Sequence, residues 1–467
     1  MIIDITVMGK GSIINGTTFV FPKDADLTAD EIRSFISAND EFAKEYDKKW
    51  QMYIGNHAIL HKNAKDHGPD NKLVNNLAHY IVETFNGYFM GIPPKITLDD
   101  DTDNEKLQQW NDTNSFQDKL NEISKQADVY GRSIAFLFQN ENSETGVAYS
   151  SPMNSFIIYD DSVLHEPLAF VRYTRDKNNI LSGQVYTDNE WYSFDDSANR
   201  AGEVNANQFG QVPAVEFFDN EERQGVFENA MTLIDALNNV VSQKANQVEY
   251  FDNGYLSMLG LNLDEDNDGK PELNLDGNQI IYSPDADATN AKVEFLAKPD
   301  GDNMQEHLTD RLINTIYQVC MVANLNDESF SGNSSGVALQ YKLLPMKNMA
   351  ANKERKFTQA LRKLYKIAFG VETILDTTKT EAWQDLKFQF TRNLPVNLAD
   401  EASTAKDLVG LVSQETLLST LSFVDDAKNE IKRMKEEQKE QIKSSLEATD
   451  NLTDQQKAGV GNGKAEE

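Results

Sequence analysis

The sequence predicts a helix-rich α+β fold with a hairpin of two long helices projecting from its main body. Three observations support this expectation. Apolar residues at helical spacing recur along most of the chain, and short alternating segments gather between residues 133 and 194. Two polar helices also flank an acidic insert with β character. Such a hairpin has too little surface of its own to bury both helices, so we expect it to pack against neighbouring copies.

Length and composition indicate several folding units in a reducing compartment. At 467 residues the chain is too long for one core. Its formal net charge of −31 repels phosphate, which argues against tight static binding to nucleic acid but not against a duplex that slides past. Cys320 is the only cysteine, so no disulfide can form within the chain. We find no signal peptide and no run of roughly 20 apolar residues, so we expect synthesis in a cytoplasm and no membrane contact.

Residues 1–220 are expected to form one α+β domain, with helices first and a mostly antiparallel sheet second. Thr28 and Glu31 form a capping box that predicts the start of the first helix. Further helices are expected at about 71–90 and 105–126, and the aspartate run at 99–101 is expected in a solvated loop. Strands are expected at 133–138, 156–159, 169–173, 184–186 and 191–194.

The hairpin itself is expected to comprise helices at 221–254 and 301–324 around an insert at 255–300. The first helix has an apolar face, and its other faces carry uncharged polar side chains that suit close packing against identical neighbours. An ordinary surface helix is the alternative. The second helix is expected to bury Leu308, Leu312, Ile316, Val319 and Cys320.

A Gly/Ser loop at 325–336 follows, and then a helix from about 337 to 369. Pro345 is expected to kink or break this helix at about residues 341–345, because proline removes one hydrogen bond and clashes with the preceding turn. Residues 386–390 alternate like a strand that rejoins the first domain's sheet. Helices are expected over 398–448, and residues 449–467 are expected to be disordered.

One pattern is typical of a hydrolase. Residues 332–336 fit the G-x-S-x-G nucleophile elbow, with Ser334 as the nucleophile. That fold requires a histidine later in the chain, and the last histidine is His307. A flexible loop is therefore favoured. We also find no nucleotide-binding motif, so we expect neither an enzyme nor a cofactor.

Two patterns could hold a metal. Asp264, Asp266 and Asp268 resemble the first half of an EF-hand loop, but Leu275 stands where a bidentate glutamate is required. An exposed acidic turn is favoured over a weak calcium site. His57 and His61 are spaced i, i+4, and surface histidines are favoured over metal ligands because no acidic third ligand stands at a recognisable spacing.

Seven short segments are similar in order and spacing to one known family. The chain resembles the portal proteins of tailed bacteriophages, in the branch typified by siphophages of Gram-positive hosts. Each segment is weak alone, but together they extend over about residues 40–440. They are 53–59 (YIGNHAI), 70–76 (DNKLVNN), 87–93 (GYFMGIP), 129–133 (VYGRS), 209–217 (FGQVPAVEF), 233–238 (LIDALN) and 334–339 (SSGVAL).

The resemblance implies a subunit of a twelve-membered ring with a wing, stem, clip and crown. It assigns the wing to residues 1–220 and 337–397, the stem to 221–254 and 301–324, the clip to 255–300 and the crown to 398–448. It also implies that segment 325–336 is the tunnel loop at the channel constriction. The residues of this loop are Ser329, Phe330, Ser331, Gly332, Asn333, Ser334, Ser335 and Gly336.

The function implied by the resemblance is passive transport. The ring would form a channel at the capsid vertex through which double-stranded DNA is packaged and ejected without sequence-specific binding. Its implied partners are the terminase large subunit, head-completion or adaptor proteins, and the major capsid and scaffolding proteins. The implied location is the virion, with assembly in the host cytoplasm. A calcium-dependent surface-binding protein remains the alternative function.

Overall fold

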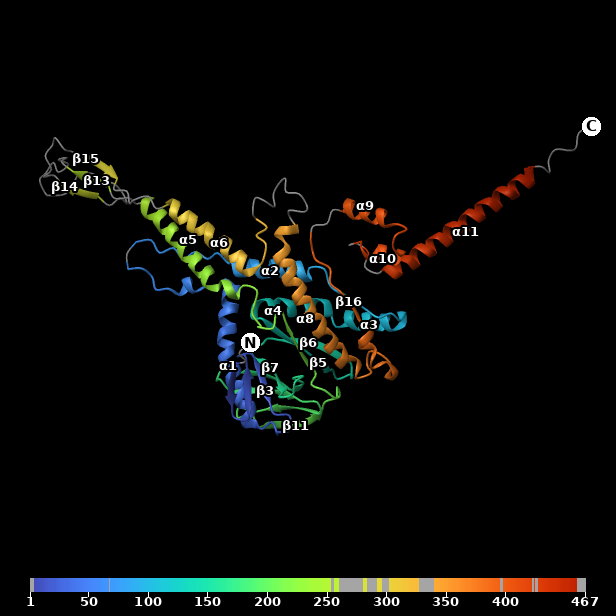
Figure 1. The fold of residues 1–467 in the computed structure, drawn as a ribbon, viewed down its shortest axis with the longest axis horizontal. Helices are drawn as coiled ribbons and strands as arrows, with labels where there is room; N and C mark the ends of the chain where they lie inside the picture. Colours follow the sequence, from blue (N-terminus) through green and yellow to red (C-terminus); the bar gives the residue numbers. More distant parts are fainter. Residues whose placement is uncertain are drawn as a thin grey trace, which may run out of the picture. The chain divides into compact units, whose positions relative to one another are not determined.

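The computed structural model describes residues 4–66, 68–252, 256–259, 280–283, 292–295, 302–326, 340–394, 398–421, 424 and 427–459. The chain divides into two compact units, Met1–Arg392 and Asn393–Glu467. Long helices and several sheets confirm the expected mixed α+β class (Figure 1).

An eight-stranded sheet forms the base of the first unit. Its pairs are antiparallel except for β3 and β7, which confirms the mostly antiparallel expectation. Three strands precede the first helix, so the expectation of helices first is wrong. Asn15 and Gly16, both at positive φ, join two of these strands, and Asn-Gly is a strong hairpin signal that the sequence analysis missed. In sheet order the strands are β1 (Ile5–Met8), β2 (Gly11–Ile14), β3 (Thr18–Phe21), β7 (Ser155–Asp160), β8 (Pro167–Arg175), β9 (Leu181–Tyr186), β10 (Glu190–Phe194) and β11 (Arg200–Ala206).

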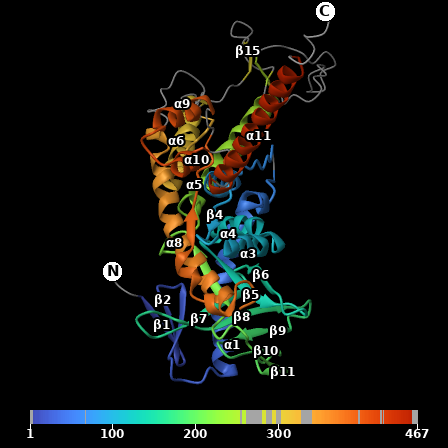
Figure 2. The same cartoon turned by 90° about the vertical axis from the view of Figure 1, so that its right-hand side faces the viewer.

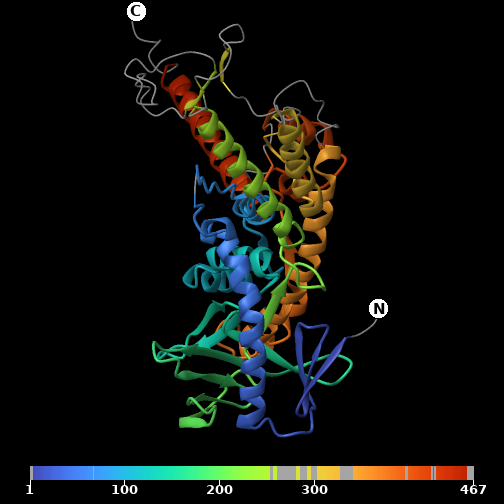
Figure 3. The same ribbon diagram turned by 90° about the vertical axis from the view of Figure 1, so that its left-hand side faces the viewer.

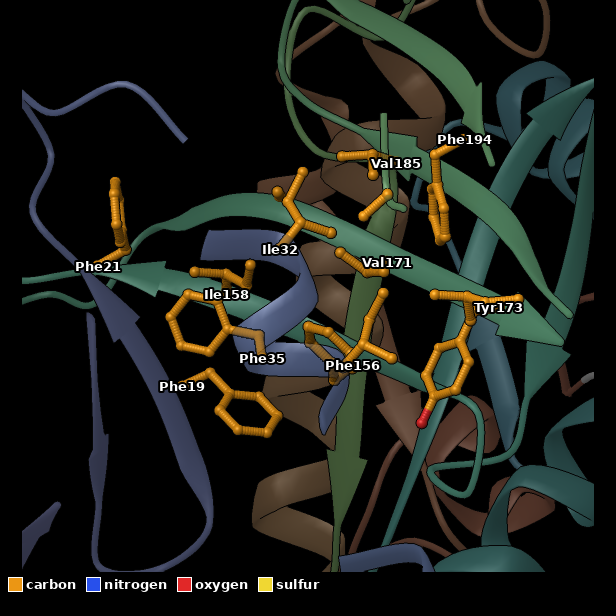
Figure 4. Close-up of a cluster of buried hydrophobic side chains, with 14 of the residues drawn as sticks. Phe19, Phe21, Ile32, Phe35, Phe156, Ile158, Val171, Tyr173, Val185 and Phe194 are labelled. Atoms are coloured by element: carbon orange, nitrogen blue, oxygen red, sulfur yellow. The ribbon is translucent and has the colours of Figure 1, made fainter. Parts of the chain in front are cut away.

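Helix α1 (Ala29–Tyr53) covers one face of this sheet (Figure 3). Thr28 caps it as expected, because its hydroxyl accepts a hydrogen bond from the Glu31 amide. Phe35 packs edge-on against Phe19, and the side chains of Phe156 and Ile158 point toward the same cluster (Figure 4). Alternate residues of a strand face opposite sides, so this cluster forms the core between α1 and the sheet.

A second layer covers the opposite face. Ile157 and Phe170 of the large sheet pack there against residues of β5 (Arg132–Gln139) and β12 (Ala214–Phe218). These two strands and β6 (Thr145–Ser150) form a three-stranded sheet. Helices α4 (Phe116–Tyr130) and α8 (Leu344–Phe369) pack against its outer side (Figure 2). Each strand expected between 133 and 194 is therefore present.

Helix boundaries differ from the expected ones in several places; α5 (Met231–Asp252), for example, begins ten residues later than the expected residue 221. Helix α2 (Leu77–Met90) begins six residues later than expected, with Asn76 as its cap. The single helix expected at 105–126 is two helices, α3 (Asp101–Thr113) and α4, because Ser115 adopts a left-handed backbone conformation with φ of 48°. Asp100, expected in a solvated loop, caps α3, and hydrogen bonding by the Asp103 amide lowers the pKa of its carboxyl.

The remaining short elements of the first unit include two small sheets and several 3₁₀ turns. Strand β16 (Lys387–Gln389) does not rejoin the large sheet; it pairs antiparallel with β4 (Lys95–Thr97) alone. The other small sheet has the order β14-β13-β15. Its strands are β13 (Leu256–Leu259), β14 (Ile280–Ser283) and β15 (Lys292–Phe295), and the short 3₁₀ turns are η1 (Ala58–His61), η2 (Glu228–Ala230), η5 (Thr377–Lys379) and η6 (Ala382–Asp385).

The described residues of the second unit form mainly helices. It contains α9 (Leu398–Leu408), α10 (Gln414–Ser419) and α11 (Ala427–Gly459). Helix α11 includes residues 449–459, which the sequence analysis placed in a disordered tail, and its many Ala, Glu, Gln and Lys residues are strong helix formers. In the described part of the chain, no helix combines the length and hydropathy that a membrane span requires.

Candidate functional site

Two long helices of the first unit, α5 (Met231–Asp252) and α6 (Asp302–Cys320), lie side by side (Figures 1 and 3). We call this pair the helical stem. Lys244 of α5 forms an ion pair with Glu306 of α6. Ile316 and Cys320 are buried on the inner side of α6. Burial raises the pKa of the Cys320 thiol to about 12, which fits the expected core thiol.

The apolar stripe of α6 is only half covered by this chain. Ile316 and Cys320 are buried, but Leu308 and Val319 remain 45% and 39% exposed, so the prediction that they are buried within the chain is wrong. Met304 is 74% exposed. At 100° per residue, these three exposed side chains fall within about 60° of one another around the helix. They define one outer stripe.

The polar face of α5 binds a neighbouring extended segment. Asn238, Ser242 and Asn246 accept hydrogen bonds from every second backbone amide of residues 71–75, which we call the strap. The donor–acceptor distances are 2.7 Å for the Asn75 amide, 2.8 Å for that of Leu73 and 2.6 Å for that of Asn71. The amides that an isolated strand would leave unpaired are thus satisfied by side chains.

We call these three hydrogen bonds the strap ladder. The ladder forms because the spacing of side chains along one face of α5 matches the spacing of alternate amides in the strap. Four residues of an α-helix rise about 6 Å, and two residues of an extended chain rise about 6.6 Å. Every fourth side chain of α5 therefore meets every second amide of the strap. This explains why residues 71–76 are not helical, and it corrects the expectation that these polar side chains face identical neighbours.

His57 lies at the Asn238 end of the strap ladder. It is 1% exposed, so the interpretation as a surface histidine is wrong for it. Asn238 donates from its amide nitrogen to Nδ1 of His57 at 3.0 Å, and Nε2 of His57 lies 3.3 Å from Oδ1 of Asn76. With Asn238 donating, Nδ1 is the acceptor and the proton of a neutral ring sits on Nε2.

Residues 223–228 lead into α5, and we call them the stem root. They pack against the C-terminal end of α4. The Val226 amide donates to the carbonyl of Asp128 at 2.8 Å. Lys49 of α1 is 7% exposed and pairs with Glu228 at 2.7 Å, which also accepts from the Gly225 amide. The backbones approach so closely that a Cβ on Gly225 would lie 2.5 Å from the Val129 carbonyl.

A buried carboxylate supports the same root from the sheet side. Glu216 of β12 lies 3.2 Å from Arg132 and 3.1 Å from Arg223, and it accepts a hydrogen bond from Tyr159. Burial alone would raise the pKa of Glu216, but the two guanidinium groups lower it to about 2. Glu216 is therefore charged at neutral pH and holds the turn that leads into the stem.

The residues singled out in the sequence lie mostly outside the described part of the chain. This applies to the Ser329–Gly336 segment and to Asp264, Asp266 and Asp268. Leu343 lies in a turn, and Pro345 lies in the first turn of α8. Among the described residues, no three His, Cys, Asp or Glu side chains are placed to hold a metal ion.

Comparison with known proteins defines the class. The family model that matches residues 32–444 is described as "Phage portal protein, SPP1 Gp6-like". The chain therefore belongs to the SPP1 Gp6-like phage portal proteins, which confirms the resemblance. It is 25% identical over 403 residues to the portal protein of Bacillus phage SPP1, covering 79% of this chain and 77% of that protein. It is 22% identical over 461 residues to the portal protein of Clostridium phage phiCD119, covering 92% and 100%. Portal proteins are structural, non-enzymatic components of the phage capsid.

The strap ladder makes a specific prediction. Asn238→Ala removes the acceptor of the Asn75 amide, in a part-buried hydrogen bond, and the donor to His57, in a buried one, so we expect a loss of about 1–3 kcal/mol in stability. Hydrogen exchange of the Asn75 amide should accelerate. Asn239→Ala is the control, because this neighbour contacts no strap amide. Equal exchange of the Asn75 amide in the two variants would contradict the ladder.

The close approach of backbone segments at the stem root leads to a second prediction. Gly131 has φ of 91°, and a Cβ there would lie 1.8 Å from the Arg223 carbonyl oxygen. Gly202 has φ of 83° but open space around it. Gly202→Ala should cost about 1 kcal/mol through backbone strain alone. Gly131→Ala should cost at least about 2 kcal/mol more through overlap, seen as a lower thermal unfolding midpoint. Similar unfolding midpoints for the two variants would show that Gly131 and the Arg223 backbone can move apart without loss of stability.

Proposed function

We propose that this portal protein assembles with copies of itself into a ring, whose channel conducts double-stranded DNA during packaging and ejection. Family membership supports the role in the capsid. The observation that carries the assembly is the outer stripe of α6, Met304, Leu308 and Val319, which the single chain leaves exposed. Large apolar side chains that share one exposed side of a helix favour an interaction site over a solvated surface.

A complementary surface lies on the strap side of the stem. A groove of about 570 Å³ is lined there by the apolar residues Leu73, Val241 and Val248, with Lys244, Glu249 and Glu306 among its polar lining residues. Leu73 and Val248 are 42% and 56% exposed. The outer stripe and this groove are different surfaces of one subunit, and contacts between different surfaces are head to tail. Head-to-tail contacts close into a ring when the rotation divides a full turn, and twelve subunits is the number we propose.

The negative charge suits transport. A ring of subunits that each carry −31 offers phosphate few sites of strong attraction, so a duplex can move with little friction. We propose that residues 329–336 form the tunnel loop at the channel constriction and follow the grooves of the moving duplex. The wing, stem, clip and crown assignments made from the resemblance belong to this proposal.

The partners follow from the same proposal. The ring would act as a passive platform for the terminase large subunit during packaging and for head-completion proteins afterwards. It would also contact the major capsid and scaffolding proteins in the host cytoplasm. The alternative, a calcium-dependent surface-binding protein built on Asp264, Asp266 and Asp268, predicts a monomer whose melting temperature rises with calcium.

Assembly through the outer stripe can be tested directly. Leu308→Asp places a charge in the apolar interface, so native mass spectrometry should show rings for the wild type and single chains for the variant. Asn314→Asp is the control, because it adds the same charge to an exposed position of α6 away from the stripe. Rings that form equally well in both variants would exclude this surface, and a wild type without rings would exclude the assembly.

The tunnel loop can be tested in infected cells. Removal of residues 331–334 should leave rings intact but prevent capsids from filling with DNA, because the shortened loop cannot follow the duplex. Replacement of the same residues by Gly-Ser-Gly-Ser keeps the length and should preserve filling. Normal filling of capsids that carry the shortened loop would count against a role for this segment.

A further inference from the structure

A buried cluster of three charged side chains joins α8 to the rest of the first unit. Lys353 of α8 and Asp128 of α4 are 0% exposed, and Asp219, immediately after β12, is 5% exposed. Nζ of Lys353 lies 2.8 Å from Oδ1 of Asp128 and 3.2 Å from Oδ1 of Asp219. The cluster therefore links three separate segments of the chain.

Aromatic rings seal the cluster. Nζ of Lys353 lies 5.2 Å from the ring centre of Phe85, 5.0 Å from that of Phe89 and 5.1 Å from that of Phe357. Nζ also donates to the carbonyl oxygen of Ser124 at 3.3 Å. The ammonium group is thus well stabilised by carboxylates, a carbonyl and π faces together.

The two carboxylates lack sufficient counter-charge and hydrogen-bond donors. Two carboxylates and one ammonium leave one uncompensated negative charge in a site without solvent, which is costly. Among the described residues, Oδ2 of Asp128 and Oδ2 of Asp219 have no hydrogen-bond donor, and Oδ1 of Asp219 has only its ion-pair contact with Nζ of Lys353. The two carboxyl groups are close neighbours, because an oxygen of each lies within 3.2 Å of the same Nζ atom. One proton between them would remove the excess charge and bond one orphaned oxygen to the other carboxyl.

Other charged groups around the cluster are already paired. Glu354, the next residue of α8, pairs with Arg392, and Glu221 beyond Asp219 pairs with Lys356. No further counter-charge for the two aspartates is found among the described residues. The remaining pairs on the packed elements are Glu83 with Tyr53, Glu122 with Lys125, Glu216 with Arg132 and Arg223, and Glu228 with Lys49.

We propose that Asp128 and Asp219 share one proton beside Lys353, and that the loss of this proton loosens the attachment of α8 to α4 and β12. This inference goes beyond the proposed function, and it holds whether or not the chain forms rings.

The direction of the pH dependence follows from the cluster's surroundings. Burial raises the pKa of Asp128 well above the usual range of an aspartate, opposed by Lys353 and reinforced by Asp219. Burial likewise raises the pKa of Asp219. A raised pKa in the folded state gives stability that is complete below the unfolded pKa and is lost as the pH rises through the folded pKa. Between these two values, each pH unit should raise the opening constant of α8 tenfold.

Hydrogen exchange of the full chain tests this dependence. Asp128→Asn keeps the shape and mimics the protonated carboxyl, so its cluster has no proton to lose. The ratio of the opening constants of wild type and variant, measured at the α8 amides around Lys353 and corrected for intrinsic exchange, should rise tenfold per unit over part of the range from about pH 5 to 9. A ratio that does not change with pH would overturn the proposal.

Infrared spectroscopy provides a readout that does not depend on the variant's stability. Wild-type protein with isotope-labelled aspartate should show the carbonyl band of one protonated carboxyl group at neutral pH. Asp219→Asn should abolish that band, because the remaining Asp128 carboxylate then pairs with Lys353 one to one. If the wild type shows no protonated aspartate at neutral pH, the shared proton does not exist.

Discussion

The C-terminal turn of α4 is the point on which the rest of the first unit depends. The backbone carbonyl of Asp128 accepts a hydrogen bond from the Val226 amide at the stem root. The side-chain carboxyl group of Asp128 pairs with Lys353 of α8. One residue therefore fixes two elements that are distant in sequence. Gly131 ends this helix with positive φ and lets the Arg223 backbone approach to a distance that no Cβ allows. Movement of the stem or of α8 must therefore be accommodated at this junction or be transmitted through it.

The two helices of the stem present different kinds of surface. Amide and hydroxyl side chains of α5 satisfy the strap, so the hydrogen-bonding groups of this face are used within the chain. The outer stripe of α6 is apolar and stays exposed, and the described residues supply no strap to cover it. A surface helix in a monomer gains nothing from exposed apolar residues at regular spacing, whereas an interface does. The sequence pattern was informative, but it assigned the two kinds of face to the wrong partners.

Local patterns predicted much of the fold, and long-range contacts decided the rest. Strands between 133 and 194 alternate clearly, and Thr28 caps the first helix as expected. The strap looked helical because nothing nearby in sequence shows that its amides bind side chains some 170 residues away. Lys353 lies in a run of charged residues that is typical of a solvated face, and only the fold brings it to Asp128 and Asp219. Membership of the family was recognisable because short segments keep their order and spacing even where identity is low.

Charge sets a condition on any assembly of this chain. Copies that each carry −31 repel one another, and at physiological ionic strength this repulsion extends about 8 Å from each charge. Association therefore requires surfaces that lack uncompensated acidic groups at close range. Met304, Leu308 and Val319 supply uncharged surface on α6, and Val248 does so on α5. In the proposed ring, apolar contact between stem helices would have to exceed this repulsion.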